Sequence, residues 1–166
     1  TGDDTLISDS SDTGIDSIDA GIGTDTIDFS SVTGNVVIDL SDTNGDNVTN
    51  DGFGNTDTAD NFENVIGSNQ SDTITGDANA NSIEGGTGAD TIASGDGDDI
   101  ITTSTGDKVI TTGTGANTIT TSTGADTITT SSGDDTITSN DGDDIIDAGA
   151  GTNTITTGAD SDTGPK

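Results

Sequence analysis

The chain has 166 residues, of which 32 are acidic and two are basic, so its formal net charge is −30. A charge of this sign and size excludes electrostatic binding to nucleic acid, and to anionic membrane surfaces, as a default function. The absence of Cys and His removes disulfides, thiolate metal sites, the usual zinc ligand and the usual general base. Hydrophobic residues make up 25% of the chain and aromatic residues 2%, too little for an ordinary globular core, and no apolar run is long enough to be inserted in a membrane.

Residues 1–28 contain three copies of a nine-residue unit with an acidic sixth place and an aliphatic eighth place. The sixth places hold Asp4, Asp16 and Asp25, and the eighth places hold Leu6, Ile18 and Ile27. The first two aliphatic residues are 12 positions apart rather than nine, so we expect residues 8–10 to bulge out. The chain opens inside a unit, which suggests a piece of a larger protein.

The nine-residue period fails between residues 29 and 66, where we expect a non-repeat β insert. Val36, Ile38 and Leu40 alternate with their neighbours, which predicts a longer strand with one buried face. The stretch DNFENVI, residues 60–66, carries apolar side chains that are expected to return the chain to the repeat.

A polar loop within this insert begins Asp42-x-Asn44-x-Asp46, as an EF-hand calcium loop does. The twelfth place of such a loop normally holds a bidentate acid, but here it holds Phe53. The loop is therefore either a separate calcium site or an ordinary acidic surface loop.

Residues 67–156 divide into ten consecutive blocks of nine with no residue left over. The eighth place is always isoleucine, and the sixth place is Asp in six blocks, Asn in three and Lys in one. Each block has a turn half rich in Gly, Ser, Asn and Asp, and a strand half that is typically Thr-Ile-Thr. The pattern decays over residues 157–166, either as a cap or where a fragment was cut.

This fixed short period predicts an all-β parallel solenoid forming a single elongated domain over residues 1–166. Nine residues allow one strand and one turn, so two blocks close one coil, with strands on two faces and turns on two edges. Side chains alternate along a strand, so the isoleucines form a thin core ladder between the two faces. Stacked coils bring like-charged turns together, so we expect folding to require bound cations.

Ca²⁺ suits this arrangement because it accepts six to eight carboxylate and carbonyl oxygens in irregular geometry. The predicted ligands are sixth-place carboxylates and the backbone of glycine-rich turns. The aspartates are Asp4, Asp16, Asp25, Asp72, Asp90, Asp99, Asp126, Asp135 and Asp144, and the glycines are Gly21, Gly23, Gly86, Gly88, Gly95, Gly97 and Gly142. Acids in the third and fifth places are expected to be either outer ligands or solvated; they are Asp96, Asp98, Asp134, Asp141 and Asp143.

Alternate blocks share an edge of the predicted solenoid. The sixth places of the first edge hold Asp72, Asp90, Lys108, Asp126 and Asp144, and those of the second edge hold Asn81, Asp99, Asn117, Asp135 and Asn153. Asn keeps an oxygen but loses the charge, so we expect weaker sites on the second edge. Lys108 either places its ammonium where an ion would lie or points into solvent. Three blocks, which begin at Thr103, Thr121 and Thr130, have Thr-Ser in place of glycines, and their turns are expected to be less suited to calcium.

The blocks resemble the GGxGxDxUx nonapeptides of RTX (repeats-in-toxin) proteins, where U is a large aliphatic residue. Residues 85–93, GGTGADTIA, match at every defined place, while residues 20–28 and 94–102 miss one terminal glycine. The resemblance implies a parallel β-roll that binds several Ca²⁺ ions. It also implies export through a type I secretion channel and folding outside the cell or at the bacterial surface.

The sequence thus favours a calcium-dependent extracellular structural module, such as a stalk, a scaffold, or a surface-layer-like or adhesin segment. A less favoured role is the folding-assistance tail of a secreted enzyme or toxin. No enzymatic activity is expected, because the paired acids fall on a repeat with no aromatic platform and no unique cleft. Exposed end coils would allow self-association into a lattice or fibre.

An alternative function is ice binding. Outward threonines recur as Thr118/Thr120, Thr136/Thr138 and Thr154/Thr156 on one face, and as Thr73/Thr75 and Thr127/Thr129 on the other. Such Thr-x-Thr rows resemble the ice-binding faces of some antifreeze proteins. They also suit a soluble strand without further function, and Ile100, Val109 and Ile145 interrupt them.

Overall fold

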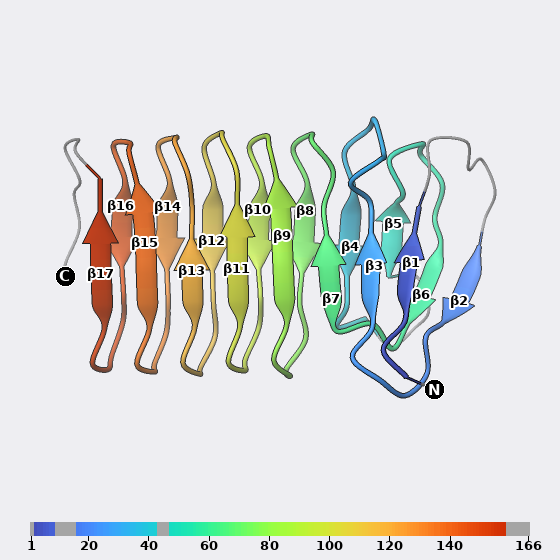
Figure 1. Cartoon of the computed structure of the whole chain (residues 1–166), viewed down its shortest axis with the longest axis horizontal. Helices are drawn as coiled ribbons and strands as arrows, with labels where there is room; N and C mark the ends of the chain where they lie inside the picture. The colour runs from blue at the N-terminus through green and yellow to red at the C-terminus, as the bar shows by residue number, and fades with distance from the viewer. Residues whose placement is uncertain (1, 9–15, 43–46, 159–166) are drawn as a thin grey trace.

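The computed structural model describes residues 2–8, 16–42 and 47–158, and these residues form strands and turns with no helix. The strands stack side by side as the successive coils of a solenoid (Figure 1). This arrangement confirms the predicted all-β parallel β-roll with two nine-residue units in each coil.

Three sheets are present among the described residues. The eight-stranded sheet contains, in spatial order, β1 (Thr5–Ile7), β3 (Thr26–Asp28), β7 (Asn64–Ile66), β9 (Ser82–Gly86), β11 (Ile100–Thr103), β13 (Thr118–Thr120), β15 (Thr136–Asn140) and β17 (Thr154–Thr157). The seven-stranded sheet contains β16 (Ile145–Asp147), β14 (Thr127–Thr129), β12 (Val109–Thr111), β10 (Thr91–Ala93), β8 (Thr73–Thr75), β4 (Val37–Asp39) and β5 (Val48–Asn50). A separate pair joins β2 (Ser17–Asp19) to β6 (Thr58–Asp60). All pairings between these strands are parallel except that of β4 with β5.

The eighth-place isoleucines form the predicted core ladder. In the eight-stranded sheet Ile83, Ile101 and Ile119 are direct partners in register, and the same register continues along both large sheets. Nine of the ten eighth-place isoleucines of residues 67–156 are buried, with 0–4% of their surface exposed, and Ile155 in the last strand is half-buried. Each coil therefore contributes two aliphatic side chains to one continuous row.

Residues 29–66 add their own strands to both large sheets. β4 pairs in register with β8, so Ile38 lies opposite Ile74, and β7 pairs with β9, so Val65 lies opposite Ile83. Aromatic and aliphatic side chains thicken the core at this end of the roll; they are Phe29, Val32, Val36, Val48 and Phe62, all buried.

The strand predicted around Val36, Ile38 and Leu40 has the predicted alternation but not the predicted length. Val36 and Ile38 are buried, yet β4 covers only three residues. The reason is local: Asp39 Oδ1 accepts hydrogen bonds from the Ser41 N–H at 3.0 Å and the Ser41 hydroxyl at 2.6 Å. This side-chain turn ends the strand at the length of the repeat strands beside it.

Three predictions fall wholly or partly on residues outside the described ranges. They are the bulge at residues 8–10, the Asp42-x-Asn44-x-Asp46 loop, and the decay of the repeat over residues 157–166. Within the described residues, no helix of sufficient length and apolar character to span a membrane is found.

The neighbouring residues Ile100 and Ile101 provide a matched test of the core ladder. Ile101 is fully buried and Ile100 is 54% exposed on the outer face of the same strand. We expect Ile101→Ala to lower the free energy of unfolding in calcium by about 2–5 kcal/mol, because it opens a cavity between coils. Ile100→Ala should change it by no more than about 0.5 kcal/mol. Urea unfolding followed by circular dichroism measures both, and equal losses would contradict the observed strand orientation.

Candidate metal centres in the turns

The sixth-place residue of every unit lies directly before its strand, at the inner side of the turn. From Asp72 to Asp144 this position is buried on both edges in spite of its polarity, although ionised side chains are rarely buried without a partner. The buried aspartates are Asp25, Asp72, Asp90, Asp99, Asp126, Asp135 and Asp144, with 0–2% of their surface exposed. The other two predicted ligands, Asp4 and Asp16, are exposed near the N-terminal end of the roll.

One oxygen of each buried carboxylate binds the backbone of the preceding coil. Asp99 Oδ1 accepts the Asn81 N–H at 2.9 Å, and Asp144 Oδ1 accepts the Asp126 N–H at 2.9 Å. An amide oxygen can take the same place, since Asn117 Oδ1 accepts the Asp99 N–H at 3.1 Å. This inter-coil bond explains why the sixth place can alternate between Asp and Asn on the second edge.

The second oxygen of most of these carboxylates is buried and has no hydrogen-bond partner. This holds for Oδ2 of Asp25, Asp90, Asp99, Asp126, Asp135 and Asp144, among which Asp90 Oδ2 has an ion-pair partner instead. A buried, unpaired carboxylate oxygen is costly, and burial accordingly raises the pKa of the Asp99 and Asp126 carboxyls above the ordinary value of 3.8. A hard cation bound at these oxygens would remove that cost, so the donor set fits Ca²⁺.

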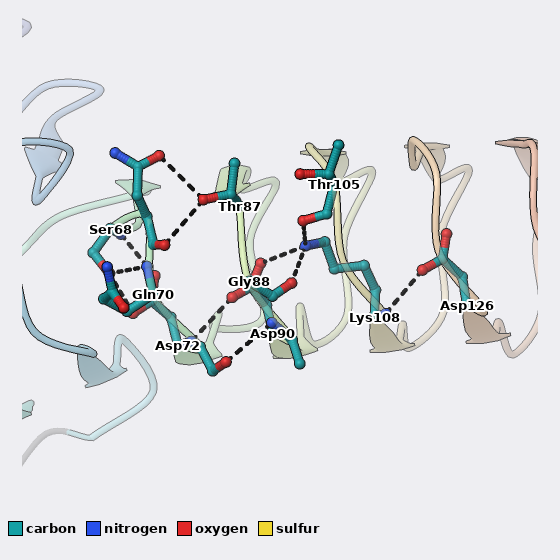
Figure 2. A network of polar contacts seen from close by, with 12 residues as sticks. Ser68, Gln70, Asp72, Thr87, Gly88, Asp90, Thr105, Lys108 and Asp126 are labelled. Atoms are coloured by element: carbon teal, nitrogen blue, oxygen red, sulfur yellow. Dashed lines mark hydrogen bonds and ion pairs between the residues drawn. The ribbon is translucent and has the colours of Figure 1, made fainter.

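Asp72 differs from the other buried sixth-place aspartates because both of its oxygens accept hydrogen bonds from the protein. Oδ1 accepts the Val36 N–H at 2.7 Å and the Ser68 hydroxyl at 2.8 Å, and Oδ2 accepts the Ser68 N–H at 2.7 Å. Figure 2 shows Ser68 and Asp72 at the start of the first edge. Val36, which takes the sixth-place position one coil earlier, offers no side-chain ligand, so protein donors serve Asp72 in place of a cation.

Glu63 occupies a sixth-place position that the sequence analysis did not identify. It directly precedes β7, and its Oε2 accepts the Asp25 N–H at 2.7 Å, as a sixth-place aspartate would. The signal was present in the sequence, because Val65 lies nine residues before Ile74 and Glu63 two residues before Val65. Val in place of Ile concealed this unit.

The glycines predicted as carbonyl ligands have a clear packing role. Gly88, Gly97 and Gly142 adopt positive φ, and a Cβ on any of them would overlap a backbone carbonyl of the preceding coil. Gly23, Gly86 and Gly95 face the same close approach, whereas Gly21 has open space around it. The turns can therefore stack at the strand spacing only with glycine at these places, and calcium binding by the glycine backbone remains a prediction.

Lys108 is buried, so of the two alternatives left open by the sequence, the one in which its side chain points into solvent is wrong. Its ammonium Nζ lies 3.1 Å from Asp90 Oδ2, in an ion pair whose two side chains are both fully buried. Nζ also donates to the carbonyl oxygens of Gly88 and Thr105, the latter at 3.1 Å (Figure 2). One carboxylate and two carbonyls from two successive turns thus surround a positive charge.

The third- and fifth-place acids are exposed and bind backbone N–H groups of the following coil. Asp98 Oδ1 accepts the Ala116 N–H at 2.7 Å, and Asp134 Oδ1 accepts the Thr152 N–H at 2.7 Å. Asp96 binds Thr114 in the same way, and this backbone hydrogen bond holds the pKa of Asp96 below its ordinary value. These three acids therefore form an outer inter-coil ladder, while Asp141 and Asp143 are also exposed.

First-place hydroxyls are a further set of buried polar groups that the sequence analysis did not assign. The Asn117 amide donates to Thr112 Oγ1 at 3.1 Å, which places the first-place hydroxyl beside the sixth-place side chain. Equivalent hydroxyl oxygens of Ser94, Thr103, Thr130 and Ser139 are buried without a hydrogen-bond partner. Their position makes them additional oxygen donors in the same turns.

No three acidic side chains converge into one cluster within the described part of the chain. Each level of an edge supplies one sixth-place side chain, so carbonyl and hydroxyl oxygens would have to complete any coordination sphere. Ca²⁺ tolerates such mixed and irregular ligand sets, whereas Mg²⁺ demands a near-ideal octahedron.

Parallel coils of nine-residue units with a buried carboxylate at each turn define a cation-binding β-roll. The comparison with family models agrees: a model of four copies of the RTX calcium-binding nonapeptide repeat matches residues 66–101, 75–110, 102–137, 111–146 and 129–163. The matches cover more than half of the chain, which therefore belongs to the RTX calcium-binding nonapeptide repeat family. A comparison with curated proteins finds none that matches this chain.

Proposed function

We propose that this calcium-binding repeat module is a structural segment of an extracellular protein and that it folds into a stiff rod when Ca²⁺ binds between its coils. The observation that carries the proposal is the column of buried Oδ2 atoms without partners in a chain of net charge −30. A calcium ion supplies positive charge at these oxygens. The chain supplies the stacked turns, with Oδ1 of each sixth-place residue fixing the carboxylate against the preceding coil.

The sites along the two edges are proposed to differ in strength. Asp126 and Asp144 occupy successive levels of the first edge, and the Asp126 N–H donates to Asp144 Oδ1, so two carboxylates meet there. On the second edge Asp99 and Asp135 are separated by Asn117. The charge of a ligand set governs calcium affinity, so the Asp126–Asp144 level should bind most tightly.

The proposed location is outside the cell. RTX repeats are typical of secreted proteins, and extracellular calcium modules commonly bind with dissociation constants of about 10⁻⁴–10⁻³ M. A chain with so small a core would remain unfolded where calcium is scarce and fold where it is abundant. A stalk, a scaffold, or a surface-layer-like or adhesin segment uses such a rod directly, and association of rods into a lattice or fibre is a further part of this proposal.

Asp99 and Asp98 provide a matched test of calcium binding. Each accepts one backbone N–H through Oδ1, and Asn would preserve that bond, but only Asp99 buries an unpartnered Oδ2. We expect the wild-type β-signal in circular dichroism to rise with calcium and fall with chelator. The calcium midpoint should increase roughly threefold to tenfold in Asp99→Asn and remain unchanged in Asp98→Asn. A wild-type signal indifferent to calcium and chelator would contradict the proposal, as would equal shifts in the two variants.

Ice binding is a second candidate because the threonines of one face are in register. Thr118, Thr136 and Thr154 are direct partners on β13, β15 and β17, and Thr120, Thr138 and Thr156 form a parallel row two residues along. The three members of the first row are exposed, so regularly spaced hydroxyl and methyl groups lie on a flat sheet. This surface extends over three adjacent coils before Ile100 replaces threonine on β11.

Thr136 lies at the centre of this face and Thr129 lies exposed on the opposite face. If the threonine rows bind ice, the calcium-loaded chain shows thermal hysteresis. Thr136→Tyr should abolish the hysteresis, because the bulky ring keeps the flat surface from contacting the ice crystal. Thr129→Tyr should leave the hysteresis unchanged. Ice-crystal morphology and freezing hysteresis at high protein concentration measure the effect. Absence of any hysteresis in the folded wild-type chain excludes this second function.

A further inference from the structure

We propose that Lys108 is a built-in cation that replaces calcium at one level of the first edge and holds the two coils it joins together without metal. This inference rests on the proposed function, because it assigns one level of the calcium column to a side chain. It concerns a residue that departs from the aspartate expected at the sixth place, in the fifth of the ten consecutive blocks.

The backbone of Lys108 keeps its normal place in the repeat. Its N–H donates to Asp126 Oδ1 at 2.8 Å, and its carbonyl accepts the Thr127 N–H at 2.8 Å. These are the bonds that sixth-place aspartates make. The substitution therefore changes only what the side chain contributes to the space between the turns.

The side chain runs toward the preceding coil, and its ammonium lies among three oxygens (Figure 2). The carbonyls of Gly88 in that coil and of Thr105 in the same turn as Lys108 accept hydrogen bonds, and Asp90 Oδ2 in the preceding coil is the ion-pair partner at 3.1 Å. Asp90 Oδ2 is the counterpart of the Oδ2 atoms that remain unpartnered at Asp99, Asp126 and Asp144. Lys108 thus satisfies one such oxygen with a covalently attached charge.

An ammonium in this position and a divalent cation bound to the same three oxygens exclude each other. They would compete for the same space, and two positive charges in contact repel each other strongly inside a protein. On the first edge, the level between β10 and β12 is accordingly independent of calcium, while Asp126 and Asp144 beyond it have Oδ2 atoms that need a cation. Removal of calcium should therefore open the roll from its C-terminal coils toward this level.

Hydrogen exchange of the whole chain in calcium-free buffer with chelator tests this order. In the wild-type chain we expect stronger protection at β10 and β12 than at β14 and β16, the strands that directly follow Asp126 and Asp144. Lys108→Met removes the charge and leaves Asp90 buried and unpaired, so exchange at β10 and β12 should accelerate by at least about tenfold. Thr111→Asp, an exposed change on β12 with the same effect on net charge, is the matched control and should leave the protection pattern as it is.

The ion count in saturating calcium tests the replacement itself. Lys108→Asp restores a sixth-place carboxylate and should bind at least one more Ca²⁺ ion than the wild-type chain in native mass spectrometry, whereas Lys108→Met should gain none.

Two results would overturn the inference while calcium binding by the other turns stands. One is a folded Lys108→Asp chain that binds the same number of ions as the wild type. The other is a metal-free wild-type chain whose protection at β10 and β12 does not exceed that at β14 and β16, or is unaffected by Lys108→Met. Failure of the proposed function has a different signature, because the wild-type chain would then bind no calcium at all.

Discussion

The structure depends on one constraint: the sixth-place side chain is buried inside the turn, and in most units it is a carboxylate. The sixth-place side chain is needed inside the turn because its Oδ1 accepts the backbone N–H of the preceding coil. The same placement buries Oδ2, which finds no protein donor at most levels. A polar group that stabilises the stack through one atom therefore destabilises it through the other, and a bound cation resolves the conflict.

The remaining features of the roll follow from close stacking. Glycine is required where a turn contacts the backbone carbonyls of the preceding coil, since a Cβ on Gly88 or Gly142 would overlap one of these carbonyl groups. The core holds one aliphatic side chain per strand, so it cannot offset the repulsion of a chain with 32 acidic residues. Exposed Asp98 and Asp134 add inter-coil hydrogen bonds at the outside of the turns, which strengthens the stack but adds to its negative charge.

Three levels of the roll solve the charge problem in three different ways. At Asp72 the backbone and hydroxyl of Ser68 supply donors to the carboxylate. At Asp90 the Lys108 ammonium supplies a full positive charge. At Asp126 and Asp144 the chain provides no donor for Oδ2, and this is where the family's calcium ions are expected. The protein thus combines calcium-dependent levels with levels that its own side chains satisfy.

The sequence was sufficient to predict the two main sheets, because the invariant eighth-place isoleucine specifies which face of each strand is buried and hence the register. It was also sufficient to place Asp90, Asp99, Asp126, Asp135 and Asp144 inside the turns. Glu63 was missed because Val65 broke the isoleucine pattern, and the direction of the Lys108 side chain could not be decided because its carboxylate and carbonyl partners lie in other blocks. The short length of β4 results from the hydrogen bond between the Asp39 side chain and the Ser41 backbone, and a pattern of hydrophobic residues does not predict such a turn.

The dependence of the stack on bound cations is tested most directly by small-angle X-ray scattering of the same chain in calcium and after chelation. With calcium, the profile should be that of a compact rod with the length of the stacked coils. After chelation, the radius of gyration should rise toward that of an expanded polyanion, because buried carboxylates on successive coils are no longer neutralised. A rod-like profile that is identical in calcium and in chelator would contradict the account.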